Sequence, residues 1–331
     1  MTRTQWYDII RPGAISNILI FIVAIVLWGD FFHSGNEVAL GSESYAFNYV
    51  SEWLSLNPLI SRAIDLVVAL LVSFTILRLN EAYSFIKVRT ILPSALCVLL
   101  TGLLLQPHYL TSGSVVALLL FACIASALAL TSNNSQIHTF NIGLMLGLAA
   151  MVYPFCLLYL LVFFYFYYNI NILSLRTILS TLTGAILPLF YGSAGLWLTG
   201  QSNIFKNYLN PTVTHLRIWL PEMEGYEIAF AATAGIALVG SLVYVWLTYQ
   251  KEVLKQRRMF SFFVQMLLFT IAMMLFSRSG FNNLLNTLIF LASIIIGRVF
   301  STTVAESKLS LWSFRVLVVA IIAYSIHVLF A

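Results

Sequence analysis

Charged residues are scarce in this sequence. Only 9% of its 331 residues are Asp, Glu, Lys or Arg, whereas an ordinary soluble domain has about 25%. Hydrophobic residues make up 60% of the chain, and its mean hydropathy is +0.93. Because no soluble core hides that much apolar surface, the composition excludes an ordinary soluble protein and predicts one whose surroundings are lipid.

Cysteine is scarce as well, which argues against two kinds of site. The three cysteines, Cys97, Cys123 and Cys156, all lie inside apolar runs. No two of them have the spacing of a metal site, and none lies in a loop where a disulfide would hold a domain together. We therefore expect them to be small residues of the core.

Several signatures of chemistry are missing too. There is no Walker lysine, no Gly-x-Ser-x-Gly and no Gly-x-Gly-x-x-Gly that follows a strand, so nucleotide-driven transport has no support. The five histidines include no i, i+4 ligand pair, which argues against a zinc or diiron enzyme. The Lys and Arg behind the formal charge of +5 lie at span ends and form no patch, so no nucleic-acid partner is expected.

What the sequence does contain is a series of long apolar runs. They predict an all-α, polytopic membrane protein of about eleven transmembrane helices, since a spanning helix needs about 20 apolar residues. Without a soluble domain, linker or repeat, residues 1–331 are expected to form a single transmembrane domain. The predicted spans are residues 16–32, 58–79, 91–106, a fourth ending near 131, 140–153, 154–168, a seventh ending near 197, an eighth ending at the basic run KEVLKQRR, a ninth and tenth joined by SRSGFNN, and an eleventh ending at 331.

The basic residues predict which side of the membrane each loop occupies. Arg3 and Arg11 precede the first span, so the positive-inside rule places the N-terminus in the cytoplasm. This N-terminal segment has no small-residue cleavage site, so we expect it to be retained and not to be a signal peptide. Arg298 and Lys308 then bracket the last cytoplasmic loop. Four of the 17 Lys and Arg are left outside or at the outer boundary: Arg62, Lys206, Arg217 and Arg278.

The first outer loop carries most of the acidic candidates. Asp30 stands directly after the first apolar run, in LWGDFFH, and the loop of residues 33–57 contains Glu37 and Glu43. Asp30 is either a charge that ends the span or a general base or metal-binding carboxylate that faces the outer leaflet. The stretch SESYAFNYVSEWLSL has aromatic residues at helical spacing, which predicts a short helix in the membrane interface.

The outer cations are candidates for phosphate binding. Arg217 and His215 lie in the second outer loop, residues 199–226, and Arg278 lies in a predicted tight turn between two spans. A guanidinium group suits bidentate recognition of phosphate, although Arg also anchors span ends as a matter of routine.

Two charges lie near the start of the second span. Arg62 and Asp65 are three residues apart and therefore share a helix face. They either form an intrahelical ion pair that lowers the cost of insertion, or Arg62 presents its charge to an anionic headgroup.

Small residues and prolines predict how some spans pack. Gly143 and Gly147 form a small-xxx-small face suited to close helix contact. Pro93, Pro154 and Pro188 are expected to kink or end spans.

Part of the chain resembles an uncharacterised family of polytopic inner-membrane proteins from Gram-negative bacteria. The likeness covers residues 78–200, and it implies a bacterial inner-membrane location. The features that carry it are Asn80 before a basic turn, Arg89-Thr90, the Gly143/Gly147 span with Tyr153-Pro154, and Arg176 leading to Gly184 and Pro188.

More loosely, the layout resembles the GT-C glycosyltransferases and oligosaccharyltransferases, which have a carboxylate in a large loop after the first span. Asp30 matches that carboxylate, with Glu37 and Glu43 as second candidates, and Arg217 and Arg278 match the cations that hold a lipid-linked phosphate. The resemblance implies catalysis with a divalent cation as the one expected cofactor, but the chain departs from the family in having no Asp-x-Asp pair.

Three functions follow as hypotheses. The first is transfer of a polyprenyl-phosphate-linked glycan at the outer face of the inner membrane, with Asp30, Glu37 and Glu43 as catalytic candidates and Arg62, Arg217, Arg278 and His215 binding phosphate. The second is a non-catalytic subunit of an envelope complex, in which the two outer loops contact membrane-protein partners. The third is a secondary transporter, for which an ionisable residue inside the membrane is needed and Asp65 is the candidate.

Overall fold

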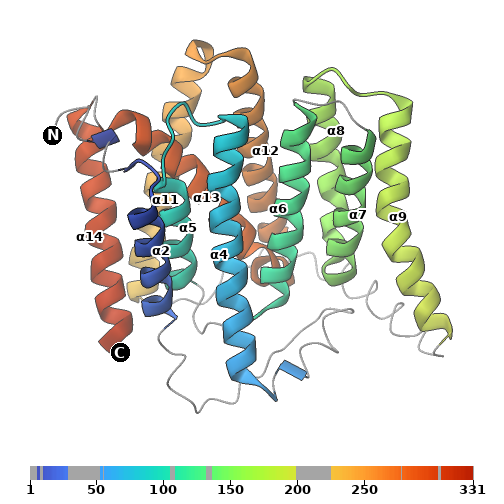
Figure 1. The fold of residues 1–331 in the computed structure, drawn as a ribbon, viewed down its shortest axis with the longest axis horizontal. Helices are drawn as coiled ribbons and strands as arrows, with labels where there is room; N and C mark the ends of the chain where they lie inside the picture. The colour runs from blue at the N-terminus through green and yellow to red at the C-terminus, as the bar shows by residue number, and fades with distance from the viewer. Residues whose placement is uncertain are drawn as a thin grey trace.

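A computed structural model of the protein describes residues 6–7, 10–28, 53–54, 56–104, 109–131, 136–198, 225–276, 278–304 and 307–330, and these residues contain helices and no strand. Figure 1 shows the helices standing side by side as one bundle. They are α2 (Ala14–Leu27), α4 (Pro58–Tyr83), α5 (Leu92–Leu104), α6 (Ser112–Leu130), α7 (Gln136–Val152), η2 (Pro154–Leu158), α8 (Tyr159–Asn169), α9 (Leu175–Leu198), α11 (Gly225–Thr248), η3 (Tyr249–Lys251), α12 (Leu254–Phe276), α13 (Arg278–Thr303) and α14 (Lys308–Phe330).

Several helices are long and apolar enough to cross a membrane. The described ranges contain 6 such segments: Pro58–Tyr83, Ser112–Leu130, Leu175–Leu198, Ile228–Thr248, Leu254–Leu275 and Gly280–Thr303. Five shorter apolar helices accompany them. Large apolar side chains such as Trp197 and Trp246 point outward from the bundle, where lipid rather than water is the favourable solvent. The chain is therefore an all-α, multi-pass membrane protein, as predicted; the number of eleven spans stays a prediction.

Successive helices run in alternating directions, which gives the bundle two distinct ends (Figure 1). The upper end in Figure 1 holds the α4–α5 connection, with Lys87 and Arg89, and the first turns of α9 and α12, with Arg176 and Arg257, and we call it the basic end. The opposite end holds the last residue of α9 and the first residues of α4, α6 and α13. By the positive-inside rule the basic end is predicted to be cytoplasmic.

Helix α13 is the centre of the bundle. Its membrane-length segment is 89% buried, and it packs against α5, α6, α11 and α12. Glycines allow this close approach: a Cβ added at Gly297 would lie 2.7 Å from Pro93 Cα, and one added at Gly113 would lie 2.6 Å from the carbonyl oxygen of Asn282. Without a lipid-facing side, α13 is where buried polar groups have the most protein partners.

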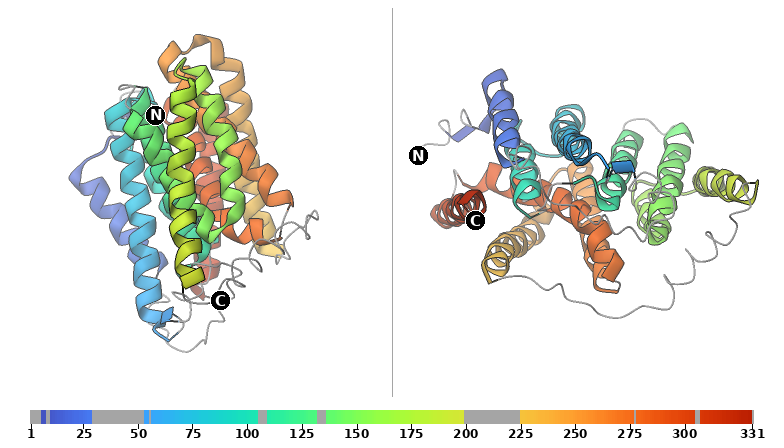
Figure 2. Two further views of the ribbon diagram at one scale, coloured as in Figure 1. Left: turned by 90° about the vertical axis from the view of Figure 1, so that its right-hand side faces the viewer. Right: turned by 90° about the horizontal axis from the view of Figure 1, so that it is seen from below.

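A second glycine contact joins α7 to α9, which lies at the edge of the bundle (Figure 2). A Cβ at Gly147 would come 2.3 Å from the Ala185 carbonyl oxygen, and one at Gly184 would come 2.4 Å from the Phe140 carbonyl oxygen. Gly143 meets the backbone of Thr181 in the same way. The predicted packing role of the glycine face is confirmed.

The cysteines and Pro154 have the expected places, whereas Pro93 lies at the start of a helix and does not end one. Pro154 begins η2 immediately after α7 ends, Pro93 lies in the first turn of α5, and Pro188 lies inside α9. The thiols of Cys97, Cys123 and Cys156 are buried and unpaired, so their predicted role as core residues is confirmed.

Two predicted boundaries are wrong. Arg278 and the following residues of SRSGFNN form the first turns of α13 and not a loop, because Ser112 at the start of α6 donates a hydrogen bond to Asn283 Oδ1 and packs this segment as helix. Arg298 does not border a loop either. It lies inside α13, five residues before the helix ends at Thr303, and its side chain is buried.

Candidate functional site

Most of the predicted site residues lie outside the described residues. These are Asp30, Glu37, Glu43, His215 and Arg217, and the same holds for most of the predicted interfacial helix and for the loop of residues 199–224. Arg278 is described through its backbone, as the first residue of α13. Arg62 is the predicted site residue whose side chain the structure places.

Arg62 is buried at the end of the bundle opposite the basic end. It lies in the second turn of α4, is 8% exposed, and donates from Nη2 to the hydroxyl of Tyr109 at 2.6 Å. Its guanidinium carbon also lies 4.8 Å from the centre of the Tyr109 ring. A cation held against an aromatic ring and away from water interacts strongly with any anion that reaches it.

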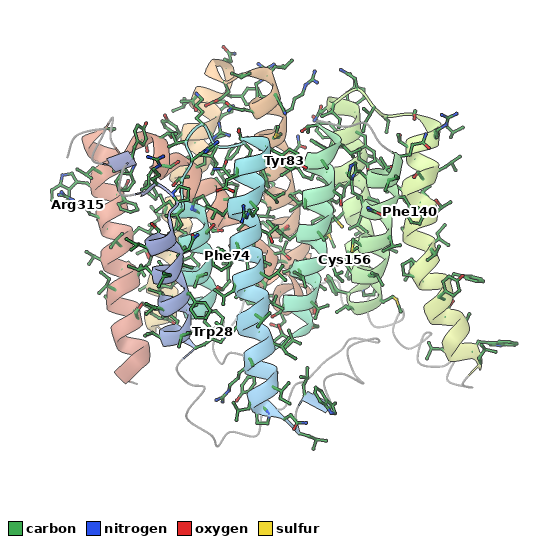
Figure 3. The ribbon with its side chains drawn as sticks, viewed as in Figure 1. Trp28, Phe74, Tyr83, Phe140, Cys156 and Arg315 are labelled. Carbon is green, nitrogen blue, oxygen red and sulfur yellow. The ribbon has the colours of Figure 1, made fainter. Side chains whose placement is uncertain are left out.

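Asp65 lies one turn further along α4 and faces different helices. Ser114 of α6 donates to Asp65 Oδ1 at 2.8 Å, and the indole of Trp28, at the end of α2, donates to Oδ2 at 3.3 Å. Figure 3 shows the Trp28 side chain between α2 and α4. Arg62 and Asp65 thus share the buried face of α4, as their spacing predicts, but they have separate hydrogen-bond partners.

Asn286 extends this network into the central helix. Its Nδ2 donates to Ser114 Oγ at 2.9 Å, so α2, α4, α6 and α13 meet at one polar site, which we call the Asp65 cluster: Trp28, Asp65, Ser114 and Asn286. The side chain of Asn286 is buried, and its Oδ1 has no hydrogen-bond partner within the described ranges. Buried polar atoms normally have partners, so an unpartnered one marks a site that can take a further donor or cation.

A second ionisable site lies at the basic end. Arg298 Nη2 is 3.1 Å from Glu252 Oε1, and Lys87 Nζ is 3.1 Å from Glu252 Oε2. The guanidinium carbon of Arg298 lies 3.8 Å from the centre of the Phe260 ring. We call Lys87, Glu252, Phe260 and Arg298 the Arg298 cluster; it joins the α4–α5 turn, the α11–α12 connection, α12 and α13.

The guanidinium group of Arg298 is incompletely hydrogen-bonded within the described residues. The residue is 6% exposed, and its Nη1 is buried with no hydrogen-bond partner among the residues that the structure describes. The sequence does signal a basic residue near a span end, but such residues are common, and nothing in the sequence separates this one from the others.

Two cavities adjoin the Arg298 cluster. One has a volume of about 180 Å³ and is lined by Arg298, Glu252, Lys87 and Thr302 among others. The other is an apolar groove of about 510 Å³ between α11, α13 and α14. Tyr244 and Val299 line both, so the two cavities are neighbours.

Neither cluster has the ligands of a metal centre. Over the described ranges, no group of three or more His, Cys, Asp or Glu side chains comes together. The carboxylates predicted to bind a divalent cation lie in the part of the chain that is not described, so that cofactor stays a prediction.

The geometry defines a class of protein: a multi-pass α-helical membrane protein with an ionisable site buried at each end of its bundle. Comparison with protein-family models, with curated proteins and with solved structures finds no match to the chain.

Proposed function

We propose that the protein acts on a polyprenyl-phosphate-linked glycan at the outer face of the bacterial inner membrane, in glycosyl or oligosaccharyl transfer. The observation that carries the proposal is Arg62, a buried cation at the end of the bundle opposite the basic end. Both predicted outer loops connect to the helices at that end, since α2 and α9 finish there and α4 and α11 begin there.

Arg62 suits the phosphate of a lipid-linked donor. Such a donor enters sideways between helices, with its chain in the lipid and its phosphate at the membrane boundary. A guanidinium group held by Tyr109 presents fixed N–H donors and a charge to that phosphate. Arg217, Arg278 and His215 are the further phosphate-binding residues of the proposal.

The carboxylate of the proposed reaction comes from the first loop. Asp30 follows Trp28 by two residues in the sequence, and Trp28 belongs to the Asp65 cluster. In the proposed step a hydroxyl of the acceptor attacks the anomeric carbon and the bond from that carbon to the phosphate oxygen breaks. Asp30 takes the hydroxyl proton, and the cations stabilise the departing lipid phosphate. Glu37 and Glu43 are the alternative bases or ligands of a divalent cation.

The test measures the envelope glycans of cells that produce each variant. It also measures the abundance of each variant in the membrane fraction. We expect Asp30→Asn, Arg217→Ala and Arg62→Gln to change the profile. Arg78→Gln is the matched control, because Arg78 lies on the same helix near its other end and its side chain is 83% exposed. If the first three variants are abundant and leave every glycan unchanged, the proposal is wrong.

A secondary transporter is a second candidate, and the Asp65 cluster favours it. A carboxylate buried inside a membrane-spanning helix is costly and is often kept for proton or ion movement. Asp65→Asn keeps the size of the side chain and removes its charge. In proteoliposomes, loss of a proton- or sodium-driven flux in this variant, together with an unchanged glycan profile in cells, would favour transport over glycan transfer.

A further inference from the structure

We propose that the pocket of the Arg298 cluster and the apolar groove beside it form one binding site for an anionic glycerophospholipid. Its phosphate would lie in the 180 Å³ pocket and its acyl chains in the 510 Å³ groove. The site is at the basic end of the bundle, opposite the proposed glycan site, and does not depend on that proposal.

The pocket has the charge and the free donor that a phosphate needs. Lys87 and Arg298 contribute two positive charges against the single negative charge of Glu252. Arg298 Nη1, which lacks a hydrogen-bond partner in the described part of the chain, belongs to a side chain that lines the pocket. Glu252 and Phe260 fix the guanidinium plane, so a bound phosphate would not have to order it.

The groove has the shape and chemistry for acyl chains. On the α11 side, Ala237 and Gly240 leave room, and a Cβ added at Gly240 would meet no atom within 4 Å. Phe300 of α13 and Val316 and Leu317 of α14 supply apolar walls. One wall of the groove is α11, a helix that faces lipid, because only 11% of its membrane-length segment is buried.

The contact between pocket and groove identifies the ligand class. Because Tyr244 and Val299 line both cavities, a molecule with a charged head and an apolar tail can occupy them together. A free phosphate would leave the groove empty, and a neutral lipid would leave the excess positive charge of Lys87 and Arg298 over Glu252 uncompensated. Basic pockets between transmembrane helices at the cytoplasmic side are a known mode of anionic-lipid recognition.

The experiment uses the full chain in lipid nanodiscs that contain phosphatidylcholine and phosphatidylglycerol in a 4:1 ratio. The protein is then transferred to detergent, and native mass spectrometry counts the phosphatidylglycerol and phosphatidylcholine that remain bound. Two variants probe the site: Lys87→Gln removes a charge from the pocket, and Gly240→Leu fills the groove. Arg298 itself is left intact, because removing it would leave Glu252 buried without its partner.

Each variant has a matched control. Gly235→Leu is made on α11 as well, where an added Cβ also meets no atom within 4 Å, but Gly235 does not line the groove. Arg78→Gln removes a charge as Lys87→Gln does, from a side chain that is more exposed and lines neither cavity.

We expect the unmodified protein to retain phosphatidylglycerol over phosphatidylcholine. Lys87→Gln should lower that preference about fivefold, the effect of one basic residue on anionic lipid. Gly240→Leu should abolish retention, and both controls should retain the lipid as the unmodified protein does. Equal retention of the two lipids would overturn the proposal. So would undiminished retention by Gly240→Leu, or full displacement of the lipid by millimolar inorganic phosphate, which would indicate a site for a free anion.

Discussion

The buried ion pair between Glu252 and Arg298 gives the strongest prediction for stability. Glu252→Gln keeps the shape of the side chain and removes the charge that lies 3.1 Å from the Arg298 guanidinium. Arg298 then stays buried beside Phe260 without its counter-charge. Removing one partner of a buried pair costs about 3 to 5 kcal/mol, and we expect Glu252→Gln to lower the free energy of unfolding by that amount.

The same carboxylate gives an internal comparison, because it also pairs with a half-exposed cation. The Lys87 side chain is 46% exposed, and exposed pairs contribute only about 0 to 1 kcal/mol. Lys87→Gln should therefore cost much less than Glu252→Gln. Arg298→Gln should cost as much as Glu252→Gln, and the double variant of Glu252 and Arg298 should cost less than the sum by about 2 to 3 kcal/mol.

The assay is reversible unfolding of the purified protein in mixed micelles that contain a rising fraction of sodium dodecyl sulfate. It measures the free energy of unfolding of the three single variants and of the double variant, each against the unmodified protein. The reasoning is refuted if Glu252→Gln costs no more than Lys87→Gln. It is also refuted if the effects of Glu252→Gln and Arg298→Gln simply add, because additive effects would mean that the two groups do not interact.

Two further predictions use the same assay. Gly147→Ala places a Cβ 2.3 Å from the Ala185 carbonyl oxygen and should lower the free energy of unfolding by about 1 to 3 kcal/mol through overpacking. Gly235→Ala is the control: the added Cβ has open space, so the change should be neutral or stabilising because alanine favours helix. Equal effects of the two changes would contradict the close α7–α9 contact. Tyr159→Phe removes a buried hydrogen bond of 2.7 Å to Thr270 and should lower the free energy of unfolding by about 0.5 to 1.5 kcal/mol. Thr270→Val should then cost less in the Tyr159→Phe background than in the unmodified protein. An equal cost in both backgrounds would show that the bond contributes nothing.

The apolar helices were the part of the fold that the sequence could predict. A bilayer demands a minimum length of apolar residues, and proline fixes where a helix can start. The second span was expected to begin at Pro58 and the sixth after Pro154, and both positions begin helical elements in the structure. Sterically required glycines were predictable for a similar reason, since the spacing of Gly143 and Gly147 puts them on one helix face.

The start of α13 was not predictable because tertiary contacts override local preference there. Ser, Gly and Asn in SRSGFNN favour a turn, and Arg278 was expected to lie in one. In the structure the segment is helix from Arg278 onward, and Asn283 accepts a hydrogen bond from Ser112 while Gly113 lies against the Asn282 backbone. Both contacts join parts of the chain that are far apart in sequence.

The buried polar sites were only partly predictable. Asp65 was recognisable as an expensive charge inside a span, but its partner Ser114, and Asn286, which donates to Ser114, are ordinary residues of other helices. The sequence predicts a span-end cation at Arg298, because the burial of this residue depends on Glu252 and Phe260, which belong to other elements of the bundle. A pattern in one segment cannot report which distant side chain will face it.

The central place of α13 has a consequence for how the protein is made. Asn286 contacts Ser114 across a sequence separation of 172 residues. At a synthesis rate of about 5 to 20 residues per second, roughly 9 to 34 s pass between the emergence of the two residues. During that interval Asp65 and Ser114 are already synthesised while the helix that covers them does not yet exist. A pause or premature stop before α13 would therefore leave the polar face of the early helices without the helix that covers it.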